Sequence, residues 1–162
     1  LTHDLGKALT PPEQWPSHHQ HGQKGVSLIK QLAKRCKVPN EHRDLAMQVS
    51  AQHTNIHNAF ELKPSTIISL FDKTDAWRKP ERFQQILLSC KADSLGRLGF
   101  ENIKYPQIEY LTEMLVAANQ VNVQAIIAQG VQGAAIKQAL TEQRVAQLTA
   151  LKPVLLVKFE KI

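Results

Sequence analysis

The dipeptide His3-Asp4, followed by Leu5-Gly6-Lys7, combines residue types that can carry out metal and phosphate chemistry. An imidazole beside a carboxylate offers one nitrogen and one oxygen ligand to a single metal ion. Lys7 adds a cation that can bind a phosphate group next to that ion. The chain begins at Leu1, which is not a usual first residue. We therefore expect a part of a longer protein, with part of its metal site upstream.

Composition narrows the class of protein. The 162 residues are 43% hydrophobic, which is enough for one substantial core. The net charge of +6 favours an anionic partner such as RNA, although an ordinary basic domain has the same composition. Aromatic residues make up only 6% of the chain, which argues against a stacking platform for single-stranded nucleic acid.

Cysteine usage and hydropathy bear on the location of the protein. Cys36 and Cys90 fall within apolar helical patterns and lack metal-binding spacing, so we expect reduced thiols in the core of a cytoplasmic protein. The sequence contains no apolar run long enough to cross a membrane and no signal peptide.

Proline positions and apolar periodicity predict an all-α fold. Helices are expected over 21–36, from Pro39, from Pro64, from Pro80 and over about 106–121. We expect a helical bundle over 1–121, a small helical extension over 122–152 and a tail over 153–162. Within that tail, Val154–Phe159 reads equally well as a strand, the end of a helix or an unstructured segment.

Helical phase directs three polar residues towards the interior. His21 shares an apolar stripe with Gly25 and Ile29, and His53 follows Val49 by one turn. Asp93 continues the apolar face of the fourth predicted helix. An unpaired buried carboxylate is costly, so Asp93 needs a cation as its partner.

Each of these residues also has a simpler explanation. A lone inward histidine is commonly a core residue with a backbone partner, and Arg97 alone would neutralise Asp93. His18 and His19 would reach a substrate phosphate or a second metal, or else lie in a solvated loop. His42 has a phase similar to that of His53, but no other pattern supports a role for it. The joint pattern with His3-Asp4 is what favours a metal site.

Several separated motifs are spread along the chain: His3-Asp4-Leu5-Gly6-Lys7, His18-His19-Gln20-His21-Gly22, His53, Leu70-Phe71-Asp72, Asp75-Ala76-Trp77-Arg78, Ala92-Asp93-Ser94-Leu95-Gly96-Arg97 and Gly130-x-x-Gly133. Together they resemble the HD superfamily of metal-dependent phosphohydrolases, and in particular the carboxy-terminal HD domain of bacterial CCA-adding enzymes of gamma-proteobacterial type. The resemblance implies an all-α HD bundle with 2′,3′-cyclic phosphodiesterase, 2′-nucleotidase and phosphatase activities. It also implies a nucleotidyltransferase domain upstream in the same chain, and a role in tRNA repair.

Residue roles follow from the pattern together with this resemblance. We expect His3, Asp4 and Asp93 to bind a divalent metal, with Asp4, His21 and His53 in the catalytic machinery. His21 and His53 would either complete a second metal position or orient the scissile phosphate, and the sequence does not choose between these roles. The residue types admit magnesium, manganese, nickel or cobalt, and the resemblance favours magnesium or nickel. Phosphate binding is expected from the following residues: Lys7, Arg97, His18 and His19.

Two other functions stay open. The chain could be a basic helical module that binds the tRNA body through Lys30, Lys34 and Lys37 without catalysis of its own. It could also be a phosphohydrolase from elsewhere in the HD superfamily, although the motifs at 75–78 and 130–133 favour the CCA-adding type. The expected partners are tRNA and nucleotide phosphate esters, and the sequence leaves open whether the chain forms a homodimer.

Overall fold

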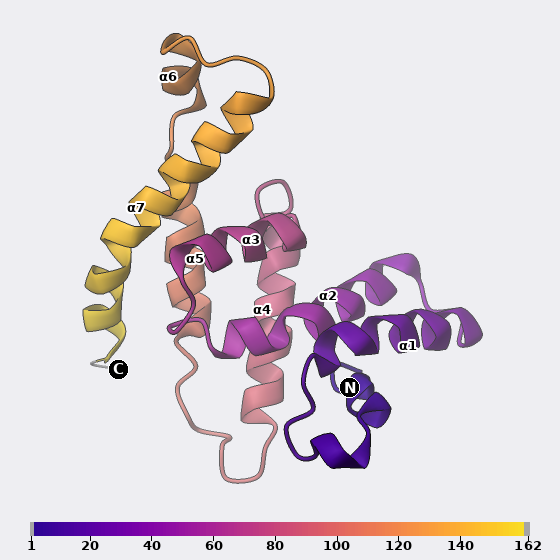
Figure 1. Ribbon diagram of the computed structural model, residues 1–162. Helices are drawn as coiled ribbons and strands as arrows, with labels where there is room; N and C mark the ends of the chain where they lie inside the picture. The colour runs from indigo at the N-terminus through magenta and orange to yellow at the C-terminus, as the bar shows by residue number, and fades with distance from the viewer. Residues whose placement is uncertain (1, 161–162) are drawn as a thin grey trace. The chain divides into compact units, whose positions relative to one another are not determined.

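The computed structural model describes residues 2–160, which contain helices and no strand (Figure 1). The all-α prediction is therefore confirmed. Two short 3-10 helices, η1 (Leu5–Leu9) and η2 (Pro12–Gln14), come first. The α-helices that follow are α1 (His21–Arg35), α2 (Asn40–His57), α3 (Pro64–Thr74), α4 (Pro80–Leu95), α5 (Gln107–Asn119), α6 (Val123–Ala128) and α7 (Ala134–Glu160).

The chain forms two compact units. The first unit contains the chain up to His57 together with Gln84–Glu101, and the second contains Asn58–Phe83 and the chain from Asn102 onwards. The predicted boundary at 152/153 does not correspond to the end of a helix, because α7 continues through Val154–Phe159 with Pro153 inside it. Of the three possibilities for Val154–Phe159, the helix is the one observed. The end of the predicted tail, residues 161–162, lies outside the described residues.

Backbones approach one another very closely in the first unit, where η1 and α2 both pack on α1. A Cβ atom on Gly6 would lie 1.8 Å from the carbonyl oxygen of His21, and one on Gly22 would lie 2.3 Å from the carbonyl oxygen of Ser50. Only glycine leaves room for such contacts. These two glycines therefore bring the His3-Asp4 segment against α1, and α1 against α2.

Aromatic side chains form the core of the second unit. The rings of Phe60 and Tyr110 lie 4.7 Å apart, and Phe159 of α7 packs 6.1 Å from Tyr110. Phe71 makes edge contacts with Trp77 at 5.4 Å and with Phe83 at 5.5 Å. Edge-to-face pairs of this kind add stabilisation beyond their buried area, so this unit depends on apolar packing.

Helix ends mostly follow the local signals in the sequence. Pro64 and Pro80 open α3 and α4, where a missing N–H costs nothing. The prediction that Cys36 is a core residue is wrong, because α1 ends at Arg35 and the Cys36 side chain is exposed. Cys90 is buried as predicted, and burial raises the pKa of its thiol to about 12. None of the helices in the described part of the chain is long and apolar enough to span a bilayer.

Candidate metal centre

Three ligand groups from three elements of the first unit converge on one point. Asp4 comes directly before η1, His21 opens α1, and His53 lies one turn before the end of α2. The Nε2 atoms of His21 and His53 are 2.9 Å apart, and Oδ1 of Asp4 lies 3.0 Å from the first and 3.8 Å from the second. Two nitrogens and one carboxylate oxygen therefore face one another at the spacing of a metal site.

Backbone carbonyls fix the tautomers of both histidines. Nδ1 of His21 donates to the carbonyl oxygen of His18 at 3.0 Å, and Nδ1 of His53 donates to that of Ser50 at 2.8 Å. A carbonyl oxygen only accepts hydrogen bonds, so each Nδ1 carries its proton. In the neutral rings, both Nε2 atoms then present lone pairs towards each other and towards Asp4. A hydrogen bond that orients a ring in this way is typical of metal-ligating histidines.

This arrangement requires a cation at its centre. Two lone pairs 2.9 Å apart repel each other unless a proton or a metal ion lies between them. Protonation of His53 is disfavoured, because burial lowers its pKa below 6.5 in spite of the opposing hydrogen bond to Ser50. The donor set of two imidazoles and one carboxylate therefore fits a divalent metal ion such as those bound by mixed N/O ligands.

A second set of contacts surrounds Asp93 on α4. Nε2 of His57 lies 3.0 Å from Oδ2 of Asp93 and donates to it, since a carboxylate only accepts. Nε2 of His3 lies 3.2 Å from Oδ1 of Asp93 and 3.4 Å from Oδ2 of Asp4. His3 thus connects the two carboxylates. Asp4 and Asp93, which the sequence predicted to share one site, lie on either side of a single imidazole.

Two cations border this cluster. Nζ of Lys7 lies 2.6 Å from Oδ2 of Asp4, and a guanidinium nitrogen of Arg97 lies 3.6 Å from Oδ2 of Asp93. Partial burial alone would raise the pKa of Asp4, but the hydrogen bond from Lys7 and the electrostatic attraction of the neighbouring cationic and imidazole groups outweigh it and lower the pKa. Asp4 is consequently ionised at neutral pH and available as a ligand.

Ser50 holds the backbone around the site. Its buried hydroxyl lies 2.9 Å from the carbonyl oxygen of Gly22 and 3.1 Å from that of His3, and donates towards both. Its own carbonyl orients His53. One residue of α2 therefore positions the segments that carry three of the histidines. Sequence patterns alone did not single it out.

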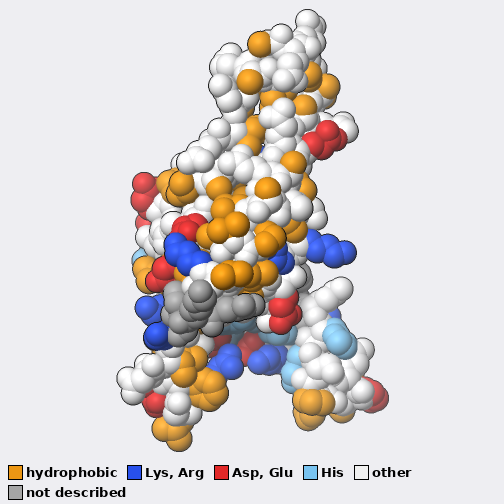
Figure 2. Space-filling model, turned by 90° about the vertical axis from the view of Figure 1, so that its left-hand side faces the viewer, with side chains coloured by type: hydrophobic (Ala, Val, Ile, Leu, Met, Phe, Trp, Pro, Cys, Tyr) orange, Lys and Arg blue, Asp and Glu red, His pale blue; other side chains and the backbone are white. Residues whose placement is uncertain are grey.

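The other predicted residues have different places. His18 contributes its backbone carbonyl to His21, whereas His19 is exposed and has no described contact with the cluster. Arg97 is 61% exposed and remains accessible to an anion. His57 was not predicted as a site residue, although its position one turn beyond His53 on α2 was the available signal. Figure 2 shows histidine, acidic and basic side chains gathered in a hollow near the bottom of the view.

The predicted RNA-binding lysines lie apart from this cluster. Lys30 and Lys34 on α1 are exposed, and Lys37 follows the end of that helix. Together with Arg43 near the start of α2, they line a cavity of about 490 Å³. The structure thus brings these cations to one surface of the first unit.

Comparison with known proteins agrees with this geometry. Residues 1–77 match the HD domain family. The chain is 58% identical over 144 residues to the multifunctional CCA protein of Shewanella frigidimarina, covering 89% of this chain and 35% of the relative. It is 55% identical over 158 residues to the multifunctional CCA protein of Shewanella denitrificans, covering 98% of this chain and 38% of the relative. No solved structure matches the chain significantly.

These findings identify residues 1–77 as an HD domain, and the fold and the His-Asp cluster fit that class. They also confirm the resemblance to the HD-containing part of the multifunctional CCA proteins. The chain spans about a third of the length of these two relatives.

Proposed function

We propose that the chain is the metal-dependent phosphohydrolase part of a CCA-type protein that processes tRNA. Its substrates are nucleotide phosphate esters, including 2′-phosphates and 2′,3′-cyclic phosphates, free or at the 3′ end of tRNA. The proposal rests above all on one observation: His21 and His53 have their Nδ1 atoms bound to carbonyls and direct both Nε2 lone pairs towards Asp4. The similarity to multifunctional CCA proteins supports the assignment to tRNA processing.

The metal would be held by Asp4, His21 and His53, with His3 and Asp93 on the adjoining side. When bound, a divalent ion lowers the pKa of a coordinated water and offsets negative charge on phosphoryl oxygens. Nitrogen and oxygen ligands suit magnesium, manganese, nickel or cobalt, and we favour magnesium or nickel.

The other residues act on the substrate and on the ligands. Arg97 is accessible and presents a planar fork that can bind two phosphate oxygens at once. Lys7 keeps Asp4 ionised and supplies a second positive charge near the phosphate. His57 donates to Asp93 and so fixes the direction in which the other oxygen of that carboxylate points.

Substitution of single ligands tests the proposal. Asp4→Asn and Asp93→Asn remove one charge each with little change in volume, so folding should be preserved. In the full-length protein, we expect each to lower hydrolysis of 2′,3′-cyclic AMP at least a hundredfold and to reduce the metal content measured by mass spectrometry. The matched control is Asp44→Asn on α2, outside the cluster. Undiminished turnover in both ligand variants would rule out this function.

A second candidate function is binding of the tRNA body. It is favoured by the shared surface of Lys30, Lys34, Lys37 and Arg43. Phosphate contacts release counterions, so affinity for tRNA should fall steeply with ionic strength. Lys34→Gln should reduce the slope of log affinity against log salt by about one and leave hydrolysis of 2′,3′-cyclic AMP unchanged. Lys137→Gln on α7 is the control for a lysine outside this surface.

A further inference from the structure

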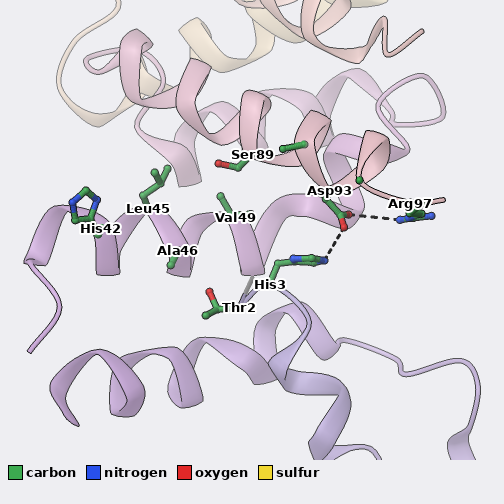
Figure 3. A pocket seen from close by; sticks show the side chains of 11 residues that line it. Thr2, His3, His42, Leu45, Ala46, Val49, Ser89, Asp93 and Arg97 are labelled. Carbon is green, nitrogen blue, oxygen red and sulfur yellow. Dashed lines mark ion pairs between the residues drawn. The ribbon is translucent and has the colours of Figure 1, made fainter. Parts of the chain in front are cut away.

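A groove of about 590 Å³ lies beside the metal centre, along the side of α2 that faces α4 (Figure 3). Its lining residues all belong to the first unit. Among the cluster residues, it reaches His3 and Asp93 but not Asp4, His21 or His53. The metal centre therefore borders the groove at one end and does not fill it.

The chemical character of the groove changes along its length. His3, Asp93 and Arg97 form the charged end, where two ion pairs join them. The middle is apolar and is formed by Leu45, Ala46 and Val49 (Figure 3). His42 lies at the opposite end of this row, near the start of α2 (Figure 3).

We propose that this groove binds the nucleoside part of the phosphoester substrate, with the phosphate at the Arg97 end and the base directed towards His42. This inference rests on the proposed hydrolase function and adds to it the direction in which the substrate lies. It also assigns His42 a role in substrate specificity.

Size and shape favour a nucleoside. Small-molecule sites are concave and mostly apolar, with volumes of about 300–1,000 Å³ and a few polar groups at fixed points. From His42 to Val49 the groove follows α2 over seven helical steps, which is roughly 10 Å at 1.5 Å per step. That length suits a base and a ribose placed end to end, with the phosphate beyond them at Asp93 and Arg97.

The polar groups also suit a nucleoside. The hydroxyls of Ser89 and Thr2 line the groove next to its apolar middle. Ser89 donates to the backbone carbonyl of Gln85 at 2.8 Å, which leaves its oxygen able to accept a hydrogen bond from a ribose hydroxyl. His42 is exposed and carries an aromatic ring on which a base can stack. A simple phosphate ester without a base would leave the apolar middle and His42 without contacts.

Binding measurements on metal-free, full-length protein separate the two ends of the groove. Ala46→Phe places a ring in the apolar middle, and Ala146→Phe, at an exposed site on α7, is the matched control. We expect Ala46→Phe to weaken binding of adenosine 2′-phosphate and of adenosine at least tenfold by calorimetry. Binding of inorganic phosphate should change less than twofold. Equal affinities for adenosine 2′-phosphate in Ala46→Phe and Ala146→Phe would overturn the proposal.

His42 gives an independent test. His42→Ala should raise the KM for adenosine 2′-phosphate about fivefold to tenfold, consistent with the loss of one stacking contact of about 1 kcal/mol. His42→Phe should restore most of the affinity, because it retains an aromatic face. The KM for β-glycerophosphate, a phosphate ester without a base, should be the same in both variants. Loss of activity on both substrates alike would contradict a role in recognition of the base.

The two sources of substrate are distinguished by comparing adenosine 2′-phosphate with a short RNA that ends in a 2′-phosphate. If Ala46→Phe weakens binding of both ligands, the groove binds the terminal nucleoside whether it is free or at the end of an RNA. If only binding of the free nucleotide is sensitive to Ala46→Phe, the groove is restricted to mononucleotides.

Failure of this inference is separable from failure of the proposed function. If Asp4→Asn abolishes hydrolysis and Ala46→Phe acts equally on all substrates, the groove assignment is wrong while the hydrolase stands. If adenosine binding depends on Ala46 but no phosphate ester is hydrolysed, the groove assignment stands and the hydrolase function is wrong.

Discussion

The two units of the chain are stabilised by different kinds of interaction. All seven histidines belong to the first unit, where backbones meet at glycines and polar groups converge. The second unit contains no histidine and is held by aromatic rings and the long helix α7. Both units bury apolar side chains, but the first unit depends in addition on close backbone contact and on electrostatics, whereas the second depends chiefly on apolar area. Substitutions and pH should affect the two in different ways.

The largest effect is expected from Gly6→Ala. The added methyl group would lie 1.8 Å from a backbone oxygen, and a backbone cannot move aside as a flexible side chain can. We expect a loss of more than about 3 kcal/mol in unfolding free energy, together with loss of metal binding, measured by urea denaturation and metal titration. Gly130→Ala is the control in the second unit, where φ is +84° but the space is open. It should cost only about 1–2 kcal/mol of backbone strain; equal losses at the two glycines would mean that the close contact has no special importance.

Arg144→Met tests the second unit. The guanidinium of Arg144 lies 3.8 Å from the centre of the Trp77 ring and donates to the carbonyl oxygen of Ala118 at 3.2 Å. Removing both contacts should cost about 1–2 kcal/mol. Fluorescence-monitored unfolding in a Trp15→Phe background reports this, because Trp77 is then the only tryptophan. Hydrolysis and metal binding should be unaffected; a loss of metal affinity would show that the two units are coupled.

Ser50→Ala tests the first unit without introducing a clash. The substitution removes the hydroxyl that donates towards the carbonyls of His3 and Gly22, so we expect a loss of about 1–2 kcal/mol. The carbonyl of residue 50 still orients His53, and therefore metal affinity should fall by only about tenfold. Ser69→Ala on α3 is the control in the second unit. Unchanged stability and metal affinity in Ser50→Ala would contradict the positioning role.

The smallest effect is a gradual dependence on pH. Burial lowers the pKa of both His53 and His57 below 6.5 in the folded protein. As the pH falls below 6.5, the unfolded chain takes up protons that the folded chain does not, so stability decreases until the lower folded pKa values are reached. Urea denaturation of the metal-free protein at pH 7.5, 6.5 and 5.5 should show this decline. His57→Gln should flatten it, and a steeper decline in that variant would be inconsistent with the direction of the shift.

The helices could be predicted because their signals are local. Pro64, Pro80 and the apolar spacing set the starts of α3 and α4 within a residue. The inward direction of His21 and His53 followed from helical phase alone. Cys36 was misplaced because its apolar phase continued the stripe of α1, whereas the chain turns at Lys37, whose φ is +52°. A positive φ at a lysine has no clear signature in the sequence.

The composition of the site was less predictable than its existence. His57 joins Asp93 only because α2 and α4 place them 3.0 Å apart across 36 positions of the chain. The groove next to His42 depends on the same pair of helices. Tertiary distances of this kind cannot be deduced from periodicity, since phase gives the direction of a side chain but not what it meets. The predicted grouping of His3, Asp4 and Asp93 as metal ligands stays a prediction, and the structure adds His21 and His53 to Asp4.

The fixed ring orientations of His21 and His53 affect how many protons are released when a metal ion binds. Without a metal ion, the lone pairs of these two Nε2 atoms, 2.9 Å apart, repel each other unless a proton enters between them, and burial of His53 restricts that protonation to acidic pH. Entry of a divalent ion must expel that proton into the solvent. The heat of metal binding should therefore vary with the ionisation enthalpy of the buffer, with a slope approaching one proton per ion at mildly acidic pH. Protons and the metal ion therefore compete for the same Nε2 atoms, so the affinity for the metal should decrease as the pH falls.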